Sequence, residues 1–208
     1  MAANKIIDVI AIGIELGKLG YDTDKRKSFF QYNPDFLASN QYQKMFPFIF
    51  KRIKPIQVFS QFEGDTFKGL PPMIADSLPE VFGNIIFKEW FEAKNTSFNK
   101  ITPLEQLTYV SNRGMGAIEY HPIQEIPKSS TVDINEMVEV LKRVLEVKKD
   151  PSGENLSDLA LLNIFKIGTS AGGARPKILV SEHKQTGIII PGDIEYSDEY
   201  NHYLVKLC

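Results

Sequence analysis

The residues best suited to chemistry are three glycines near the start of the last fifth of the chain. Gly168, Gly172 and Gly173 have no Cβ, so the backbone N–H groups around them can approach an anion closely. The β-branched segment Lys177–Val180 follows and predicts a strand. A glycine-rich loop that leads into a strand is typical of a kinase phosphate cradle, whereas a Walker loop leads into a helix. The simpler interpretation, a turn between two elements, stays open.

A lysine about thirty residues beyond the glycines can act together with them. Lys206 lies in the apolar segment Tyr203–Leu207, which also predicts a strand. From a strand, its ammonium group can reach nucleotide phosphates while its aliphatic stem packs on the sheet. The alternative is a solvated lysine at a sheet edge. Taken together and in this order, the loop and the lysine suggest a phosphate site.

The remaining candidates for chemistry are set aside. His121, His183 and His202 are widely spaced and show no metal-ligand pattern, so each is interpreted as a structural or surface residue. The single cysteine, Cys208, excludes an intrachain disulfide and a cysteine metal cluster. No metal site is expected in this chain.

The elements that must position these residues form an α+β pattern. Strands are expected over 5–33, a turn at 33–35, and irregular or short-strand structure over 41–68. Helices are expected over 70–79, 81–93, 102–111, 132–149 and 156–165. Further strands are expected over 117–121, 177–180, 187–190 and 203–206, with a domain boundary in the polar stretch 122–130. The aromatic stretch Phe46–Phe50 and the aromatic residues Phe87, Trp90 and Phe91 are expected in the core.

Composition and charge exclude several broad classes. The chain has 208 residues, 43% hydrophobic and 24% charged, as expected for a globular protein. The net charge of -2 argues against tight, non-specific nucleic-acid binding by the whole chain. No apolar run reaches 18 residues and the start has no signal-peptide pattern, so no membrane segment is expected and a cytoplasmic location is favoured.

Three segments, in order along the chain, resemble motifs of one family. Gly168–Lys177 (GTSAGGARPK) resembles the Ser-Ala-Gly-Gly-Ala-(Arg/Gln)-Pro-Lys signature of HipA-like serine/threonine kinase toxins. Gly69–Pro79 is similar to that family's Pro-Pro-Phe-Phe-x-Asn-Leu-Leu-Pro segment, and Thr102–Ala117 to its helix followed by Gly-x-Gly-Ala. The resemblance is collinear over nearly the whole chain.

The resemblance implies roles for individual residues. Ser170 corresponds to the phosphate-loop serine that becomes autophosphorylated and switches the kinase off, and Thr169 is a neighbouring hydroxyl that can also be modified. The turn that covers the nucleotide corresponds to Ala171, Gly172, Gly173 and Ala174. Lys206 corresponds to the lysine that pairs with the ATP phosphates.

The resemblance also implies what other residues must supply. The family's catalytic aspartate and its metal-binding asparagine and aspartate are expected beyond residue 208, so no catalytic residue is assigned here. The expectation is an amino-terminal subdomain over 1–122, followed over 123–208 by the start of a kinase-like domain with an antiparallel sheet. ATP and Mg²⁺ belong to the complete kinase, and this chain alone is expected to bind neither tightly and to show no turnover.

The resemblance implies partners as well. The family is neutralised by a DNA-binding antitoxin of the HipB kind, and the complete kinase phosphorylates an aminoacyl-tRNA synthetase, an activity linked to persistence. The alternative is a non-catalytic subunit of a split toxin–antitoxin system, which binds and modulates a separate kinase chain or the antitoxin. Direct nucleic-acid binding and membrane association are not expected for either.

Overall fold

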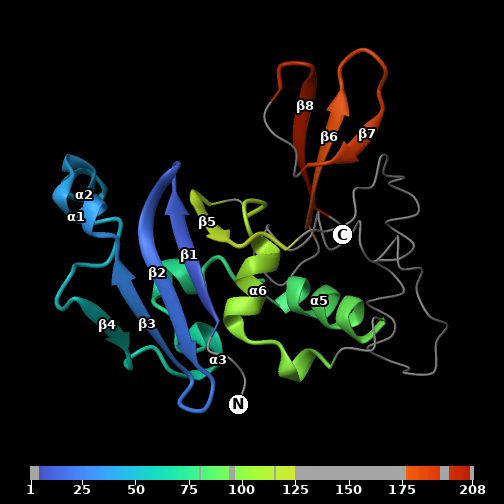
Figure 1. Cartoon of the computed structure of the whole chain (residues 1–208). Coiled ribbons are helices and arrows are strands. Elements are labelled where there is room, and N and C mark those ends of the chain that lie inside the picture. Colours follow the sequence, from blue (N-terminus) through green and yellow to red (C-terminus); the bar gives the residue numbers. More distant parts are fainter. Residues whose placement is uncertain are drawn as a thin grey trace. The chain divides into compact units, whose positions relative to one another are not determined.

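The computed structural model describes residues 5–79, 81–93, 97–114, 116–124, 177–192 and 197–206, which belong to two units. The first unit contains the chain up to Leu78 together with Thr102–Gln124, and the second contains Pro79–Ile101 and residues from Glu125 onward. Both units combine helices with an antiparallel sheet (Figure 1). The expected α+β class is therefore confirmed, whereas the division into 1–122 and 123–208 stays a prediction.

The first unit is built on a five-stranded antiparallel sheet. Its strands are β1 (Ile6–Ala11), β2 (Ile14–Asp22), β3 (Lys27–Tyr32), β4 (Ile56–Phe59) and β5 (Ile118–His121). They lie in the order β4-β3-β2-β1-β5, so β5, from late in the unit, pairs with the first strand. The strands expected over 5–33 and 117–121 are confirmed.

One face of this sheet forms the core. Burial alternates along β1, where Ile7, Val9 and Ala11 are buried while Ile6 on the opposite face is exposed, as the period of two requires. The inner face continues into Phe30 and Tyr32 of β3. Phe50 packs on it with ring centroids 4.8 Å from Phe30 and 4.9 Å from Phe59. The largest fully buried side chains of the unit are Tyr120, Phe30, Leu19, Leu70, Ile74, Leu104 and Leu107.

The first unit also contains short helices, and their positions and lengths differ from what the sequence suggested. Asn33–Asp35 is not a turn but the start of α1 (Pro34–Ala38), because the Asn33 side chain accepts the Asp35 N–H at 2.9 Å and caps the helix. The region expected to be irregular contains α2 (Asn40–Met45) and α3 (Gly64–Phe67) besides β4. The expected helix over 70–79 is only α4 (Pro72–Ala75), with a proline in its first turn.

The aromatic stretch Phe46–Phe50 is only partly in the core. Ile49 is buried and Phe50 packs against the sheet, but Phe46 is 41% and Phe48 is 82% exposed. The expectation is therefore wrong for these two rings. The stretch passes the margin of the core, so only one side of it contacts other apolar residues.

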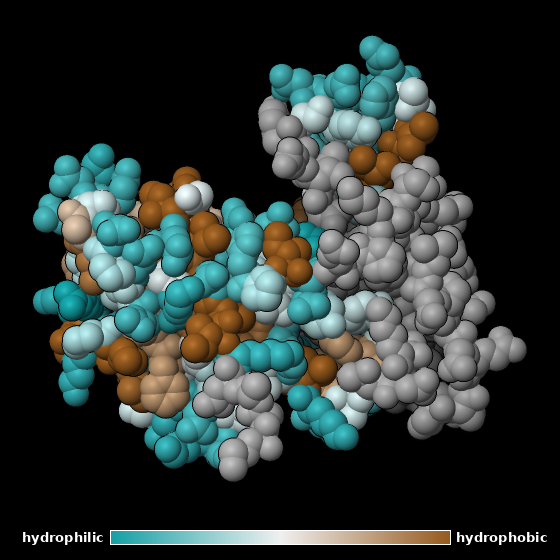
Figure 2. Space-filling model, in the orientation of Figure 1, coloured by the Kyte–Doolittle hydropathy of each residue, from teal (hydrophilic) through white to brown (hydrophobic). Residues whose placement is uncertain are grey.

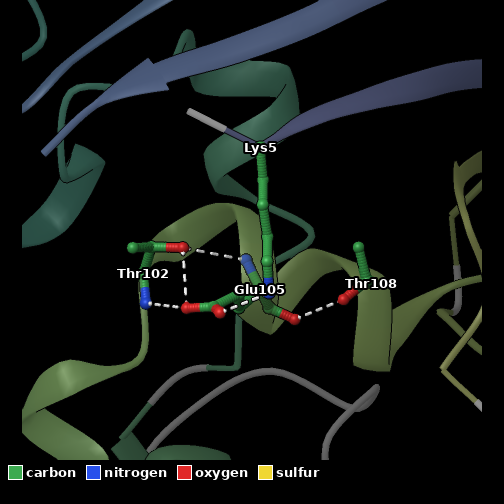
Figure 3. A network of polar contacts seen from close by, with 4 residues as sticks. All are labelled: Lys5, Thr102, Glu105 and Thr108. Carbon is green, nitrogen blue, oxygen red and sulfur yellow. Dashed lines mark hydrogen bonds and ion pairs between the residues drawn. The ribbon is translucent and has the colours of Figure 1, made fainter. Parts of the chain in front are cut away.

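The helix α6 (Pro103–Val110) is fixed by a capping box, as its sequence predicts. The Thr102 hydroxyl accepts the Glu105 N–H at 3.2 Å, and the Thr102 N–H donates to the Glu105 carboxylate at 2.9 Å. Lys5, just before β1, donates to the same carboxylate at 2.7 Å (Figure 3). This network joins the start of the sheet to the start of the helix. The helix ends at Ser111, where the backbone turns to φ 51°.

The second unit contains α5 (Val81–Ala93), the 3-10 helix η1 (Phe98–Lys100) and the strands β6 (Lys177–His183), β7 (Ile189–Pro191) and β8 (Tyr200–Lys206). Its sheet has the order β7-β6-β8. The helix α5 has the predicted bounds, and Phe87, Trp90 and Phe91 are buried as expected. The helices predicted over 132–149 and 156–165, and most of the boundary at 122–130, lie outside the described residues.

The close approach at Gly69 gives a first prediction. A Cβ on Gly69 would lie 2.1 Å from the Arg26 carbonyl oxygen, and its φ is +80°. Gly64 has a similar φ of +85° but open space around it. We expect Gly64→Ala to lower the free energy of unfolding by about 1–2 kcal/mol, because alanine is strained in the left-handed region. Gly69→Ala should lower it by about 1–3 kcal/mol more, because the backbone near Arg26 must also move. Equal decreases in the free energy of unfolding for the two variants, measured in urea, would contradict a close contact between residue 69 and the Arg26 carbonyl.

The capping network gives a second prediction. Burial alone would raise the pKa of Glu105, but hydrogen bonds from Lys5 and Thr102 outweigh it and lower this pKa. A lowered carboxyl pKa stabilises the fold above the unfolded value of about 4.3, and that contribution is lost as pH falls through the folded pKa. We expect Glu105→Gln to lower the free energy of unfolding by about 0.2–1 kcal/mol at neutral pH. The effect is small because water partly screens the ion pair between Lys5 and Glu105.

The same comparison at acidic pH provides the check. The difference between wild type and Glu105→Gln in urea unfolding should shrink as the pH is lowered through the titration of the carboxyl group. Glu15→Gln, at an exposed carboxylate on β2, is the matched control and should change little. If Glu105→Gln lowers the free energy of unfolding by the same amount at neutral and at acidic pH, the charge of Glu105 does not contribute to stability.

Candidate functional site

Lys206, the lysine predicted to pair with phosphates, is the last residue of β8. In the antiparallel register its Cα partner is Lys177, the first residue of β6. Side chains of directly opposed residues lie on the same face of a sheet, so these two cations are neighbours. The Lys206 side chain is exposed. One end of the β6-β8 ladder therefore carries two lysines, and Lys177 directly follows the glycine-rich segment in the sequence.

The other predicted site residues cannot be placed. Ser170, Ala171, Gly172, Gly173 and Ala174 lie outside the described residues, as does Thr169. The structure thus brings Lys206 beside Lys177, and the arrangement of the glycine-rich segment with them stays a prediction.

Cross-strand contacts hold the register that sets Lys206 opposite Lys177. The buried Ser181 hydroxyl lies 2.9 Å from His202 Nδ1, its direct partner on β8. Tyr203 donates to the Glu182 carboxylate at 3.1 Å, and this hydrogen bond raises the pKa of Tyr203. Because a slip of one residue would turn every side chain to the other face, these pairs fix where Lys206 lies.

Two of the three histidines, His183 and His202, form hydrogen bonds within the β6-β8 region, which fits the structural role expected for them. His183 Nδ1 accepts the backbone N–H groups of Gln185 and Thr186 at 3.3 and 3.2 Å, which stabilises the turn after β6. His121 lies 3.7 Å from Glu119. No three His, Cys, Asp or Glu side chains are grouped to hold a metal ion in the part of the chain that the structure describes. Within that same part, no helix is long and apolar enough to cross a membrane.

A basic hollow of about 410 Å³ in the first unit was not predicted from the sequence. It lies between the β2–β3 turn and α3, and its cations are Lys25, Arg26, Lys27 and Lys68. The sequence feature that could have indicated this hollow is the basic run Lys25–Lys27, but such runs usually lie on a solvated surface. Asp22, Glu63 and Asp65 lie 3.5 to 3.9 Å from three of these cations and offset their charge. Burial lowers the pKa of Lys68.

Comparison with known proteins supports the family that the sequence motifs resemble. None of the curated proteins matches the chain. The family model described as HipA N-terminal domain matches residues 7–121, which is more than half of the chain. This match includes all five strands of the first sheet except the first residue of β1, and it includes the motifs at Gly69–Pro79 and Thr102–Ala117. The chain therefore belongs to the HipA N-terminal domain family.

Proposed function

We propose that this chain supplies the amino-terminal domain and the nucleotide-covering part of the ATP site of a HipA-like serine/threonine kinase toxin. In this proposal the loop around Gly172 and Gly173 cradles phosphates with its N–H groups. Lys206 pairs with the same phosphates. Ser170 is the hydroxyl whose phosphorylation switches the site off.

The observation that carries the proposal is the register of β6 and β8. The antiparallel pairing sets Lys206 directly opposite Lys177, which is the residue after the glycine-rich segment Gly168–Pro176. A lysine on a neighbouring strand, at the end where a glycine-rich loop enters the sheet, can reach phosphates that the loop's N–H groups hold. A solvated edge lysine could lie anywhere along β8, so its position at this end favours the phosphate role.

The proposal assigns different tasks to the two charged groups. The Lys206 ammonium offsets the negative charge of the nucleotide phosphates. A phosphate on Ser170 would add a charge of about −1.5 to −2 beside them, and repulsion would then disfavour ATP. The catalytic aspartate and the Mg²⁺ ligands are supplied from outside residues 1–208, in the same polypeptide or in a second one. Residues 1–208 alone should therefore bind ATP weakly and show no turnover.

Nucleotide binding provides the direct test. We expect Lys206→Ala to weaken ATP binding about tenfold, equivalent to about 1.4 kcal/mol, in displacement of fluorescent trinitrophenyl-ATP. Lys184 is the matched control because it is exposed and follows β6 at the opposite end of the same ladder, where His183 pairs with Tyr200. Lys184→Ala should leave the displacement curve unchanged. Equal losses in both variants would indicate diffuse attraction by surface charge and contradict the assignment of Lys206.

The regulatory assignment has its own test. Tandem mass spectrometry of the protein isolated from its own cells should find phosphate on Ser170 in the peptide that contains Gly168–Lys177. Ser170→Ala should remove the modification, while Thr169→Ala, the neighbouring hydroxyl, should retain it. Phosphate on Thr169 instead, or on neither residue, would refute the switch at Ser170 without affecting the role of Lys206.

A further inference from the structure

A groove of about 600 Å³ runs beside β4 in the first unit. Its walls come from three parts of the chain: the segment 47–54, the strand β4 with the residues up to 62, and the segment 71–73 at the start of α4. This size is within the range of sites that hold ligand side chains. None of these residues belongs to the ladder that carries Lys206, so the groove is independent of the proposed ATP site.

The strand that borders the groove has a free edge. Among the described strands, β4 pairs with β3 alone and is the outermost strand of the sheet. Every second residue of an edge strand directs its N–H and C=O away from its neighbour, which makes such an edge a template for another strand. β4 has no proline in Ile56–Phe59 to block that pairing.

Large apolar side chains are exposed along this edge. Phe48 is 82%, Ile53 is 80% and Val58 is 48% exposed, and all three line the groove. Figure 2 shows apolar residues at the surface in the region where Figure 1 draws β4. Single exposed apolar residues are common, but several that line one groove indicate a binding surface.

The polar groups of the groove indicate what binds there. Lys51 and Lys54 are its charged lining residues, and no carboxylate lies among the residues that form it. Gln57 is 7% exposed, and its Oε1 accepts the Ile53 N–H at 2.7 Å, which fixes the orientation of the amide. Its Nε2 is buried as well, and none of the described residues forms a hydrogen bond with it. A buried donor of this kind costs free energy until an acceptor reaches it.

We propose that the groove binds an extended segment of a partner protein in which apolar residues alternate with acidic ones, added as a strand to the free edge of β4. Main-chain hydrogen bonds to the edge would hold the segment, and apolar side chains two residues apart would enter the groove. The acidic side chains between them point away from the groove, where the long, exposed side chains of Lys51 and Lys54 can reach them. An oxygen of the segment accepts the Gln57 amide N–H. Two lysines and an unpaired donor favour this acidic occupant over a basic one.

The test uses two labelled heptapeptides of opposite charge, Glu-Val-Glu-Phe-Glu-Val-Glu and Lys-Val-Lys-Phe-Lys-Val-Lys, with fluorescence anisotropy as the readout. The acidic peptide should bind the whole chain at least tenfold more tightly than the basic peptide. In the double variant Lys51→Glu/Lys54→Glu this preference should reverse. Both lysines are exposed, so the double variant should fold normally.

A matched pair of variants separates the groove from general stickiness. Ile53→Asp should weaken the acidic peptide at least tenfold, whereas Ile12→Asp should not change it. Ile12 is a suitable control because it is 75% exposed and lies in the β1–β2 turn of the same unit. Hydrogen exchange on the wild-type complex should show new protection within Ile56–Phe59, the sign of a strand added to β4.

Several results would overturn the proposal. They are equal affinity for the two peptides, no binding at millimolar concentration, protection confined to other strands, or an Ile53→Asp variant that binds normally. A concentration-dependent dimer in sedimentation that Ile53→Asp abolishes would show instead that a second copy covers the groove. None of these outcomes bears on Lys206, because the ATP site and the groove share no residue.

Discussion

The contact between Ser28 and Gly69 is the constraint on which the first unit depends. Ser28 on β3 is completely buried, and both its N–H and its hydroxyl donate to the Gly69 carbonyl, at 3.0 and 2.6 Å. Two buried donors without acceptors would cost about 1–3 kcal/mol each, so the backbone at residue 69 must lie against the sheet. Only glycine permits this, since a Cβ would meet the Arg26 carbonyl. Tyr21 adds a third hydrogen bond, to the Lys68 carbonyl at 2.8 Å.

This close approach gives a physical reason for the glycine at residue 69 and also positions residues that line the groove. Beyond Gly69, Leu70 and Ile74 are completely buried in the core. Pro72 is the first residue of α4, a position where the N–H that proline lacks would have no partner within the helix. The residues between them, Pro71 to Met73, line the groove together with β4. A segment that the sequence marks by glycine and prolines thus fixes a core contact on one side and a surface hollow on the other.

Local signals predicted part of this fold, and tertiary contacts determined the rest. The capping box at Thr102 and Glu105 and the alternation along β1 each act within a few residues, and the sequence located them. By contrast, β4 has four residues and exists through its pairing with β3, which its own sequence cannot specify. Asn33 suits a turn and a helix cap equally well. The exposure of Phe48 depends on where the core ends, and the candidate site at Ser170 rested on resemblance alone.

The pairing of Lys177 with Lys206 is the step that links fold and proposed function. Like charges directly opposite each other on neighbouring strands repel each other and are destabilising. Exposure to water keeps this cost small. An anion held between the two ammonium groups would turn the repulsion into attraction. The register that β6 shares with β8 is therefore the structural observation on which the proposed phosphate role of Lys206 depends.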